Sequence, residues 1–229
     1  MTLRRRLGII ARRLSRAYGA PPAPRRLPPL DELVLTILSQ NTSDTNRDRA
    51  YADLRRTFPT WEDVADAPVG AIAKAIRGGG LAPTKSPRIK AVLRGLRDEG
   101  IALDERALTR LPGVAPGESD DVLWDRLIGL PGVGPKTAAC VLLFSLGRPF
   151  FPVDTHVHRV AVRLGLVAPK ASAVRAQAEL QAVLRADEMY DVHMNLIRHG
   201  RAVCAAQRPL CSECVLQDLC PRVGVTSSR

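Results

Sequence analysis

Lys136 and Asp154 are the residues of this sequence whose types and surroundings suit covalent chemistry. Lys136 follows the glycine-rich stretch LPGVGP and is expected in the first turn of a helix that begins at Pro135. A cation is disfavoured there, because the N-terminal end of a helix dipole is positive. The same positive end, with partial burial, favours the neutral amine of a lysine, which is its nucleophilic form. The position of Lys136 therefore indicates chemistry rather than a structural role.

Asp154 lies 18 positions after Lys136 (154 − 136), in the segment PVDTH that precedes another expected helix. One interpretation is structural, because aspartate is a favoured N-cap residue. The other is chemical, because a carboxylate beside an activated lysine can stabilise a developing positive charge or accept a proton. Both interpretations are compatible with the sequence.

Gly132, Val133 and Gly134 are expected to form the turn before the Lys136 helix. Glycines at alternate positions allow a sharp turn and leave backbone amides uncovered, which suits a phosphate bound without reading of base sequence. A tight corner between two helices with no ligand is the alternative. Lys and Arg exceed Asp and Glu by 34 − 23 = 11, and the sequence pI of about 10.2 indicates a polyanionic partner, most simply nucleic acid.

The cysteines near the C-terminus form a second group with chemical potential. Cys204, Cys211, Cys214 and Cys220 have the spacing C-x6-C-x2-C-x5-C. Zinc sites usually combine two short CxxC-type pairs, and only one is present here. Disulfides are not expected in a reducing compartment. Four thiolates in one loop suit a [4Fe–4S] cluster. Cys140 lies in the helix after the glycine turn and is expected to be a small buried residue.

The length of 229 residues and the hydrophobic fraction of 45% allow one large or two small folded domains. No apolar run is long enough to span a bilayer, and the Arg-rich N-terminus lacks the continuous apolar segment of a secretory signal. Apolar residues there recur at helical spacing instead. No pair of alternating strands with a hairpin turn is present, so we expect an all-α protein.

Helical periodicity and end signals predict helices at 2–18, 30–38, 44–58, from 61, 68–77, 89–96, 103–111, 120–128, from 135, 155–164, 171–185 and 190–203. Residues 78–83 (GGGLAP) are expected to be non-helical, and 112–118 to be a loop. The stretch LPGV also occurs at 111–114, where no Gly-Pro-Lys follows, and is taken as chance or a decayed repeat.

The motif LPGVGPKTA, followed by the aspartate of VDTHVHRV, resembles the helix–hairpin–helix and Gly/Pro-rich–Asp signature of the endonuclease III family of DNA glycosylases. The resemblance extends from about residue 30 to 220 and includes the cysteine spacing, which implies a [4Fe–4S] cluster. It implies that Lys136 is the nucleophile at the sugar C1′ and that Asp154 is the essential carboxylate. Family members without this lysine only remove bases, so Lys136 implies a bifunctional glycosylase and abasic-site lyase.

Two further loops resemble DNA-contacting loops of that family. The segment LSQNTSD resembles the loop that fills the space left by a flipped nucleotide, with Gln40 and Asn41 as the possible filling residues. Leu81, with Lys85, resembles the loop that carries an apolar wedge. An exposed leucine on a glycine-rich loop more often folds back into a core, and this alternative stays open.

We therefore expect two all-α lobes. One is a helical bundle with the hairpin at 27–148, and the other combines 1–26 with 149–222 and carries the cluster, leaving 223–229 as a flexible tail. The expected function is removal of oxidised pyrimidines from double-stranded DNA, with strand cleavage by β-elimination, by a cytoplasmic (nucleoid) monomer. The alternatives are a thymine-mismatch glycosylase and a non-enzymatic, cluster-bearing DNA-binding or redox-sensing protein.

Overall fold

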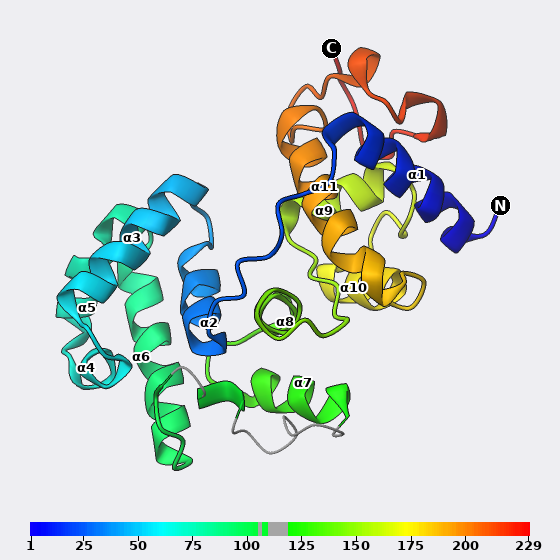
Figure 1. Cartoon of the computed structure of the whole chain (residues 1–229). Coiled ribbons are helices and arrows are strands. Elements are labelled where there is room, and N and C mark those ends of the chain that lie inside the picture. Colours follow the sequence, from blue (N-terminus) through cyan, green and yellow to red (C-terminus); the bar gives the residue numbers. More distant parts are fainter. Residues whose placement is uncertain (105–106, 110–118) are drawn as a thin grey trace. The chain divides into compact units, whose positions relative to one another are not determined.

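The computed structural model of this chain describes residues 1–104, 107–109 and 119–229, and these contain helices and no strand (Figure 1). The expected all-α class is confirmed. Within the described residues, no helix has both the length and the apolar character needed to cross a membrane. The second copy of LPGV and the expected loop at 112–118 lie outside the described residues. Of the expected helix at 103–111, the structure describes a 3₁₀ turn, η2 (Ala107–Thr109).

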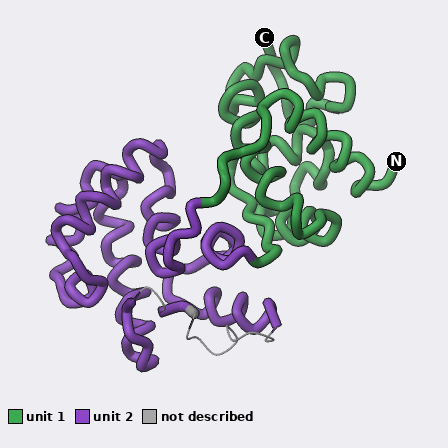
Figure 2. The backbone as a smooth tube through the Cα atoms, in the orientation of Figure 1, with its two compact units in different colours: residues 1–24, 148–229 green, residues 25–147 purple. Residues whose placement is uncertain are grey.

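The chain divides into two compact units (Figure 2). The first unit combines Met1–Pro24 with Arg148–Arg229, and the second unit is Arg25–Gly147. Lys136 belongs to the second unit, whereas Asp154 and the four clustered cysteines belong to the first.

Helix α2 (Pro29–Leu38) forms the centre of the second unit. Its sequence PLDELVLTIL is apolar on nearly all sides, and eight of its ten residues are buried. It packs against α3 (Asp44–Thr57), α6 (Ala82–Asp98) and α8 (Pro135–Cys140). A helix covered on several sides has a fixed position, so the residues at its C-terminal end are well placed to anchor a loop.

The outer helices of the second unit are α4 (Trp61–Asp66), α5 (Val69–Ala75) and α7 (Asp120–Gly129), with a 3₁₀ turn, η1 (Arg77–Gly79), after α5. A capping box begins α4, since Thr60 Oγ1 accepts from the Asp63 N–H at 3.1 Å and Asp63 accepts from the Thr60 N–H at 3.0 Å. Ser119 occupies the N-cap position of α7, but its side chain makes no capping hydrogen bond.

The expectation that residues 78–83 are non-helical is wrong at both ends. Gly78 and Gly79 lie in η1, and α6 begins at Ala82 rather than at residue 89. Pro83 fits because the first turn of a helix needs no N–H donors, while Pro87 gives up one hydrogen bond in the second turn. Gly79 is required for packing, because a Cβ there would come within 2.8 Å of the Ala50 Cβ.

The first unit contains α1 (Leu3–Tyr18), α9 (Thr155–Arg163), α10 (Ala173–Gln181) and α11 (Met189–Ala202). Helix α11 packs against both α1 and α9. The apolar stripe expected on the N-terminal helix is buried there, with Leu7, Ile10 and Leu14 at 2% exposure or less. The cysteine loop follows α11 directly and is held by the same three helices.

Candidate functional site

Lys136 lies in the first turn of α8, directly after the glycine turn, as the sequence predicts. Gly132 has φ of 79°, a left-handed conformation that favours glycine, and Gly134 is the N-cap residue. Pro135 is the first helical residue, and the Lys136 side chain is half-buried. Helix α8 continues into a π-helical turn, η3 (Val141–Ser145). The glycine turn and helix α8 therefore hold the backbone of Lys136 in a fixed position.

Val133 differs from the two glycines beside it. Its side chain is only 6% exposed, and its N–H donates to the Leu130 carbonyl at 3.1 Å, which closes the turn. The expectation that Val133 contacts phosphate together with Gly132 and Gly134 is therefore not supported, because the amide is already bonded. Val133 anchors the turn to the core, while Gly132 stays exposed.

Glu32 is a buried carboxyl group that the sequence did not single out. It lies in the first turn of α2, is 9% exposed and accepts a hydrogen bond from Thr36 Oγ1 at 3.1 Å. Burial raises the pKa of Glu32 to about 7, against the opposing effects of Thr36 and of the positive charges of Lys136 and Arg47. The signal was present in the sequence, since Glu32 and Thr36 have i, i+4 spacing in a helix whose other residues, apart from Asp31, are apolar.

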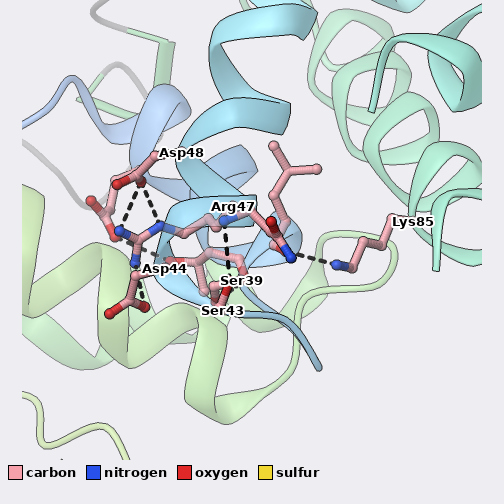
Figure 3. A network of polar contacts seen from close by, with 10 residues as sticks. Ser39, Ser43, Asp44, Arg47, Asp48 and Lys85 are labelled. Carbon is pink, nitrogen blue, oxygen red and sulfur yellow. Dashed lines mark hydrogen bonds and ion pairs between the residues drawn. The ribbon is translucent and has the colours of Figure 1, made fainter. Parts of the chain in front are cut away.

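The loop from Ser39 to Ser43 leaves the C-terminal end of α2 and leads into α3. Ser39 Oγ donates to the Thr36 carbonyl at 2.7 Å, and Ser43 Oγ caps α3 by accepting from the Asn46 N–H at 3.2 Å. Arg47 pairs with both Asp44 and Asp48 at the start of α3 (Figure 3). Both ends of the loop are thus fixed, which leaves the middle residues to project.

Asn41 and Leu81, two of the predicted DNA-contact residues, adopt left-handed backbone conformations with φ of 51° and 50°. Both side chains are exposed, Leu81 by 48%. Asparagine tolerates this conformation, but a leucine pays roughly 1–2 kcal/mol for it. The structure therefore does not fold Leu81 back into the core. An exposed apolar side chain held in a strained conformation is consistent with a contact that is absent from the free protein.

Lys85 does not have the position that a DNA contact requires. Its side chain is 1% exposed, and its ammonium donates to the carbonyls of Leu38 at 2.7 Å and Gly79 at 2.9 Å. Burial lowers the pKa of Lys85. The expectation that Lys85 contacts DNA is therefore wrong, because its donors are directed inward. Figure 3 shows Lys85 reaching from α6 toward the end of α2.

Helix α6 connects the predicted contacts of the second unit. Arg88 donates to Gln40 Oε1 at 3.1 Å, which holds Gln40 partly buried rather than free to enter DNA. The aliphatic stem of Arg88 lies against Gly132, where a Cβ would be 3.5 Å away. The loop after α2, the Leu81 loop and the glycine turn therefore all contact one helix. This grouping was not expected from the sequence, in which the three segments are far apart.

Asp154 is the N-cap residue of α9, and its Oδ1 accepts from the Val157 N–H at 2.7 Å. The Asp154 side chain is half-buried. The segment before it is held by the buried His193, whose Nδ1 is 2.9 Å from the Pro152 carbonyl oxygen. The structural interpretation of Asp154 as a cap is therefore correct, and it leaves room for a second role because the other carboxylate oxygen is not part of the cap.

Helix α9 also holds the cysteine loop. Arg159 donates to the carbonyls of Cys204 at 3.0 Å and Gly200 at 2.7 Å. Arg163 donates to the Ala205 and Ala206 carbonyls at 2.6 and 2.8 Å, and its guanidinium is 3.4 Å from Cys204 Sγ. Helix α9, which Asp154 caps, is therefore joined by hydrogen bonds to the loop with the four cysteines.

The four cysteines of the loop are free thiols that line one cavity. The remaining lining is mostly apolar and includes Val160, Leu164 and Val225. Among the described residues, no three His, Cys, Asp or Glu side chains are close enough to share one metal ion. A mononuclear zinc site needs its ligands around a single point, whereas a [4Fe–4S] cluster takes one thiolate for each of four irons. The four cysteines are the thiols at this cavity that could bind a metal ion or a cluster.

Two backbone N–H groups are directed at cysteine sulfurs. The N–H groups of Leu216 and Arg222 are each 3.4 Å from a sulfur, of Cys214 and Cys220 respectively. Burial raises the pKa of the Cys214 and Cys220 thiols, and these two N–H groups oppose that effect. Cys140, in contrast, is buried in α8 of the second unit, as expected.

His199 links the cysteine loop to the N-terminal helix. Its Nδ1 is 2.9 Å from Tyr18 Oη, and its Nε2 is 3.6 Å from Cys214 Sγ. Burial lowers the pKa of His199 to about 4, so the ring is neutral. With a thiolate at Cys214, the ring donates through Nε2, and the Tyr18 hydroxyl donates to Nδ1.

Comparison with known proteins places this geometry in a family. Residues 34–186 match the family described as HhH-GPD superfamily base excision DNA repair protein. The chain is 38% identical over 198 residues to a putative DNA glycosylase of Arabidopsis thaliana, covering 86% of this chain and 62% of that protein. It thus spans less than two thirds of that relative. It is 33% identical over 192 residues to endonuclease III of Thermotoga maritima, covering 84% of this chain and 82% of that protein.

The fold agrees with these sequence relationships. A solved structure of a trapped covalent intermediate between endonuclease III and DNA superposes with a TM-score of 0.81 at 27% identity, covering 97% of both chains. The glycine turn, the lysine after it and the capping aspartate of α9 are the features by which the sequence resembles that family. The chain belongs to the endonuclease III family of the HhH-GPD superfamily of base excision DNA repair proteins.

Proposed function

We propose that this protein is a bifunctional DNA glycosylase and abasic-site lyase that removes oxidised pyrimidines. Family membership supports a DNA glycosylase of base excision repair. The observation that carries the lyase assignment is the half-buried Lys136 in the first turn of α8, directly behind the exposed Gly132. Glycosylases of this family need a nucleophilic amine for strand cleavage, and Lys136 supplies one.

The proposed reaction begins with extrusion of the damaged nucleotide from the duplex. The Lys136 nitrogen forms a bond to the sugar C1′ with its lone pair, and the C1′–N bond to the base breaks with its electron pair leaving on the base. The Asp154 carboxylate stabilises the positive charge that develops on the sugar ring and accepts the proton released by the lysine nitrogen. Charge stabilisation of this kind is commonly the largest contribution to catalysis.

Strand cleavage follows from the same covalent bond. The C1′–O4′ bond then breaks, O4′ keeps its electron pair and takes the proton held by Asp154, and C1′ forms a protonated Schiff base with the Lys136 nitrogen. Loss of a proton from C2′ then sends its electron pair toward C3′, where the bond to the 3′ phosphate oxygen breaks. Hydrolysis of the Schiff base returns the free lysine. Gly132 and Gly134 bind a backbone phosphate and so place the sugar against Lys136.

Cys204, Cys211, Cys214 and Cys220 would hold a [4Fe–4S] cluster, which would act as a structural tie when bound. Through Arg159 and Arg163, the loop that it stabilises supports α9 and with it Asp154. Iron and sulfide analysis of the purified protein tests this assignment, with roughly four of each expected per chain. Colourless protein with stoichiometric zinc would contradict it.

The test of function is a panel of duplexes that each contain one defined lesion, assayed under single-turnover conditions. Thymine glycol, a G·T mismatch and a preformed abasic site separate the alternatives. We expect release of thymine glycol with strand cleavage, and loss of both in Lys136→Gln. If only the thymine of the G·T mismatch is released, the protein is a thymine-mismatch glycosylase and the assignment to oxidised pyrimidines is wrong. DNA binding without any release, unchanged in Asp154→Asn and sensitive to cluster oxidation, would indicate the non-enzymatic alternative.

A further inference from the structure

Lys85 occupies an unusual position, because one buried ammonium caps two helical segments at their C-terminal ends. Leu38 is the last residue of α2, and Gly79 is the last residue of η1. The carbonyls at such ends lack partners within their own helix. Lys85 Nζ donates to both, at 2.7 and 2.9 Å. Its positive charge also lies at the negative end of the α2 dipole, which favours this arrangement.

Each capped carbonyl is followed directly by a loop that carries a projecting residue. The loop after Leu38 leads to Asn41, and the loop after Gly79 leads to Leu81. Both residues are exposed and have left-handed backbone conformations. The backbone of Lys85 contributes as well, since its N–H donates to the Leu81 carbonyl at 2.9 Å. Lys85 therefore fixes the start of one loop and both sides of the other.

Two other polar side chains make contacts at the loop after α2. Arg88 binds Gln40 and lies against Gly132, and Ser39 bonds within its own turn to Thr36. The Lys85 ammonium, in contrast, donates hydrogen bonds at the base of both loops. A single group that bonds to two loops holds their separation constant.

We infer that Lys85 is a positioning residue that makes the Asn41 and Leu81 loops act as one rigid clamp for extruding a nucleotide from the duplex. The inference rests on the proposed glycosylase function. Extrusion requires the two projecting residues to enter the duplex at a fixed spacing. A paired or stacked base resists extrusion, whereas an abasic site has no base to unstack. Loss of the clamp should therefore impair base release more than cleavage at an abasic site.

Lys85→Met tests the inference, because methionine keeps most of the volume and removes the donors. Lys90→Met is the matched control, since Lys90 also lies on α6 and donates to the carbonyl of Ala67 at the end of α4, away from both loops. Leaving two buried carbonyls without donors should slow release of thymine glycol by about tenfold or more. Single-turnover cleavage at an abasic site should fall by no more than about threefold. Lys90→Met should leave the ratio of the two rates as in the wild type.

The outcomes separate the inference from the function on which it rests. Wild-type protein that is inactive on both substrates would contradict the proposed function. Active wild type with equal losses on both substrates in Lys85→Met would show a merely structural lysine and overturn the inference. If Lys85→Met does not fold, a double-mutant cycle tests the clamp instead. The cycle compares base release by Asn41→Ala, by Leu81→Ala and by the variant with both changes. A rigid clamp predicts that either single change costs nearly as much base release as both, and additive losses would overturn it.

Discussion

Asp154 Oδ1 accepts a hydrogen bond from the Val157 N–H at 2.7 Å, so this carboxylate is the N-cap of α9. The cap explains why an aspartate is tolerated at this position and also allows its two roles to be separated. Asparagine caps a helix about as well as aspartate, whereas alanine does not. The charge and the cap can therefore be removed one at a time.

Asp154→Asn should keep the stability of the wild type to within a few tenths of a kcal/mol, while Asp154→Ala should lose on the order of 1 kcal/mol. Both variants should lose base release and strand cleavage, because both lack the charge that stabilises the transition state. Urea unfolding and single-turnover assays measure the two effects. Full activity in a stable Asp154→Asn protein would show that Asp154 caps α9 but that its charge has no role in catalysis.

Glu32 should make the stability of the protein depend on pH. Its pKa is raised from 4.5 to about 7 in the folded protein, mainly by burial. Below pH of about 4.5 the group is protonated in both states. Above it the unfolded chain loses the proton first, so stability falls until pH passes about 7. Lys136 and Arg47 on neighbouring helices, and Tyr51 on α3, are the other titratable groups that interact with Glu32.

Unfolding free energies measured at pH 5 and pH 8 test this dependence. The wild type should lose on the order of 3 kcal/mol relative to Glu32→Gln between the two values, since one pKa unit corresponds to about 1.4 kcal/mol. Glu62→Gln, at an exposed glutamate of α4, is the matched control and should retain the wild-type dependence. An identical pH profile in Glu32→Gln would show that burial does not raise this pKa.

Tyr18 should influence the proposed cluster through His199. With a thiolate at Cys214, the Tyr18 hydroxyl, 2.9 Å from Nδ1, favours the tautomer in which Nε2 donates to Cys214 Sγ. Tyr18→Phe releases that restriction, and a weaker hydrogen bond to sulfur should lower the reduction potential of the cluster. Spectroelectrochemistry on loaded protein measures the shift. Tyr190→Phe is the control, because Tyr190 donates to the Pro22 carbonyl instead. Equal reduction potentials in Tyr18→Phe, Tyr190→Phe and the wild type would show that Tyr18 does not influence the cluster through His199.

Gly132 should be needed for the turn that we propose to bind phosphate. Its φ of 79° is unfavourable for alanine, although a Cβ would only touch the stem of Arg88 at 3.5 Å. Gly132→Ala should therefore weaken binding to duplex DNA by about tenfold through backbone strain, on damaged and undamaged duplexes alike. Fluorescence anisotropy with both duplexes at fixed salt measures this. A loss confined to damaged DNA would contradict a sequence-independent phosphate contact.

Much of the fold could be predicted from local signals. The N-terminal apolar stripe, the Thr60–Asp63 capping box and the helix after Asp154 depend on residues close in sequence, and all three are present. The start of α6 could not be predicted in the same way. Local rules treat Gly79 and Pro83 as helix breakers, but packing of η1 on α3 needs a glycine, and a proline is harmless in a first turn.

The site residues also divide into those that local sequence predicts and those that depend on tertiary packing. Lys136 and the glycine turn follow from a local motif, and the structure places them as expected. Lys85 was misassigned because a basic residue beside a glycine-rich loop looks exposed in a sequence. Its partners, Leu38 and Gly79, lie 47 and 6 positions away, and only the packing of α6 against α2 brings them together. Glu32 was missed for a similar reason, since its burial and its proximity to Lys136 are tertiary effects.

Borohydride trapping tests the central claim most directly. Reduction of the Schiff base should join Lys136 irreversibly to duplex DNA that carries an abasic or thymine-glycol site. We predict a covalent adduct for the wild type that peptide mapping places on Lys136, and none for Lys136→Gln. No adduct with the wild type, or equal trapping by Lys136→Gln, would contradict the lyase assignment.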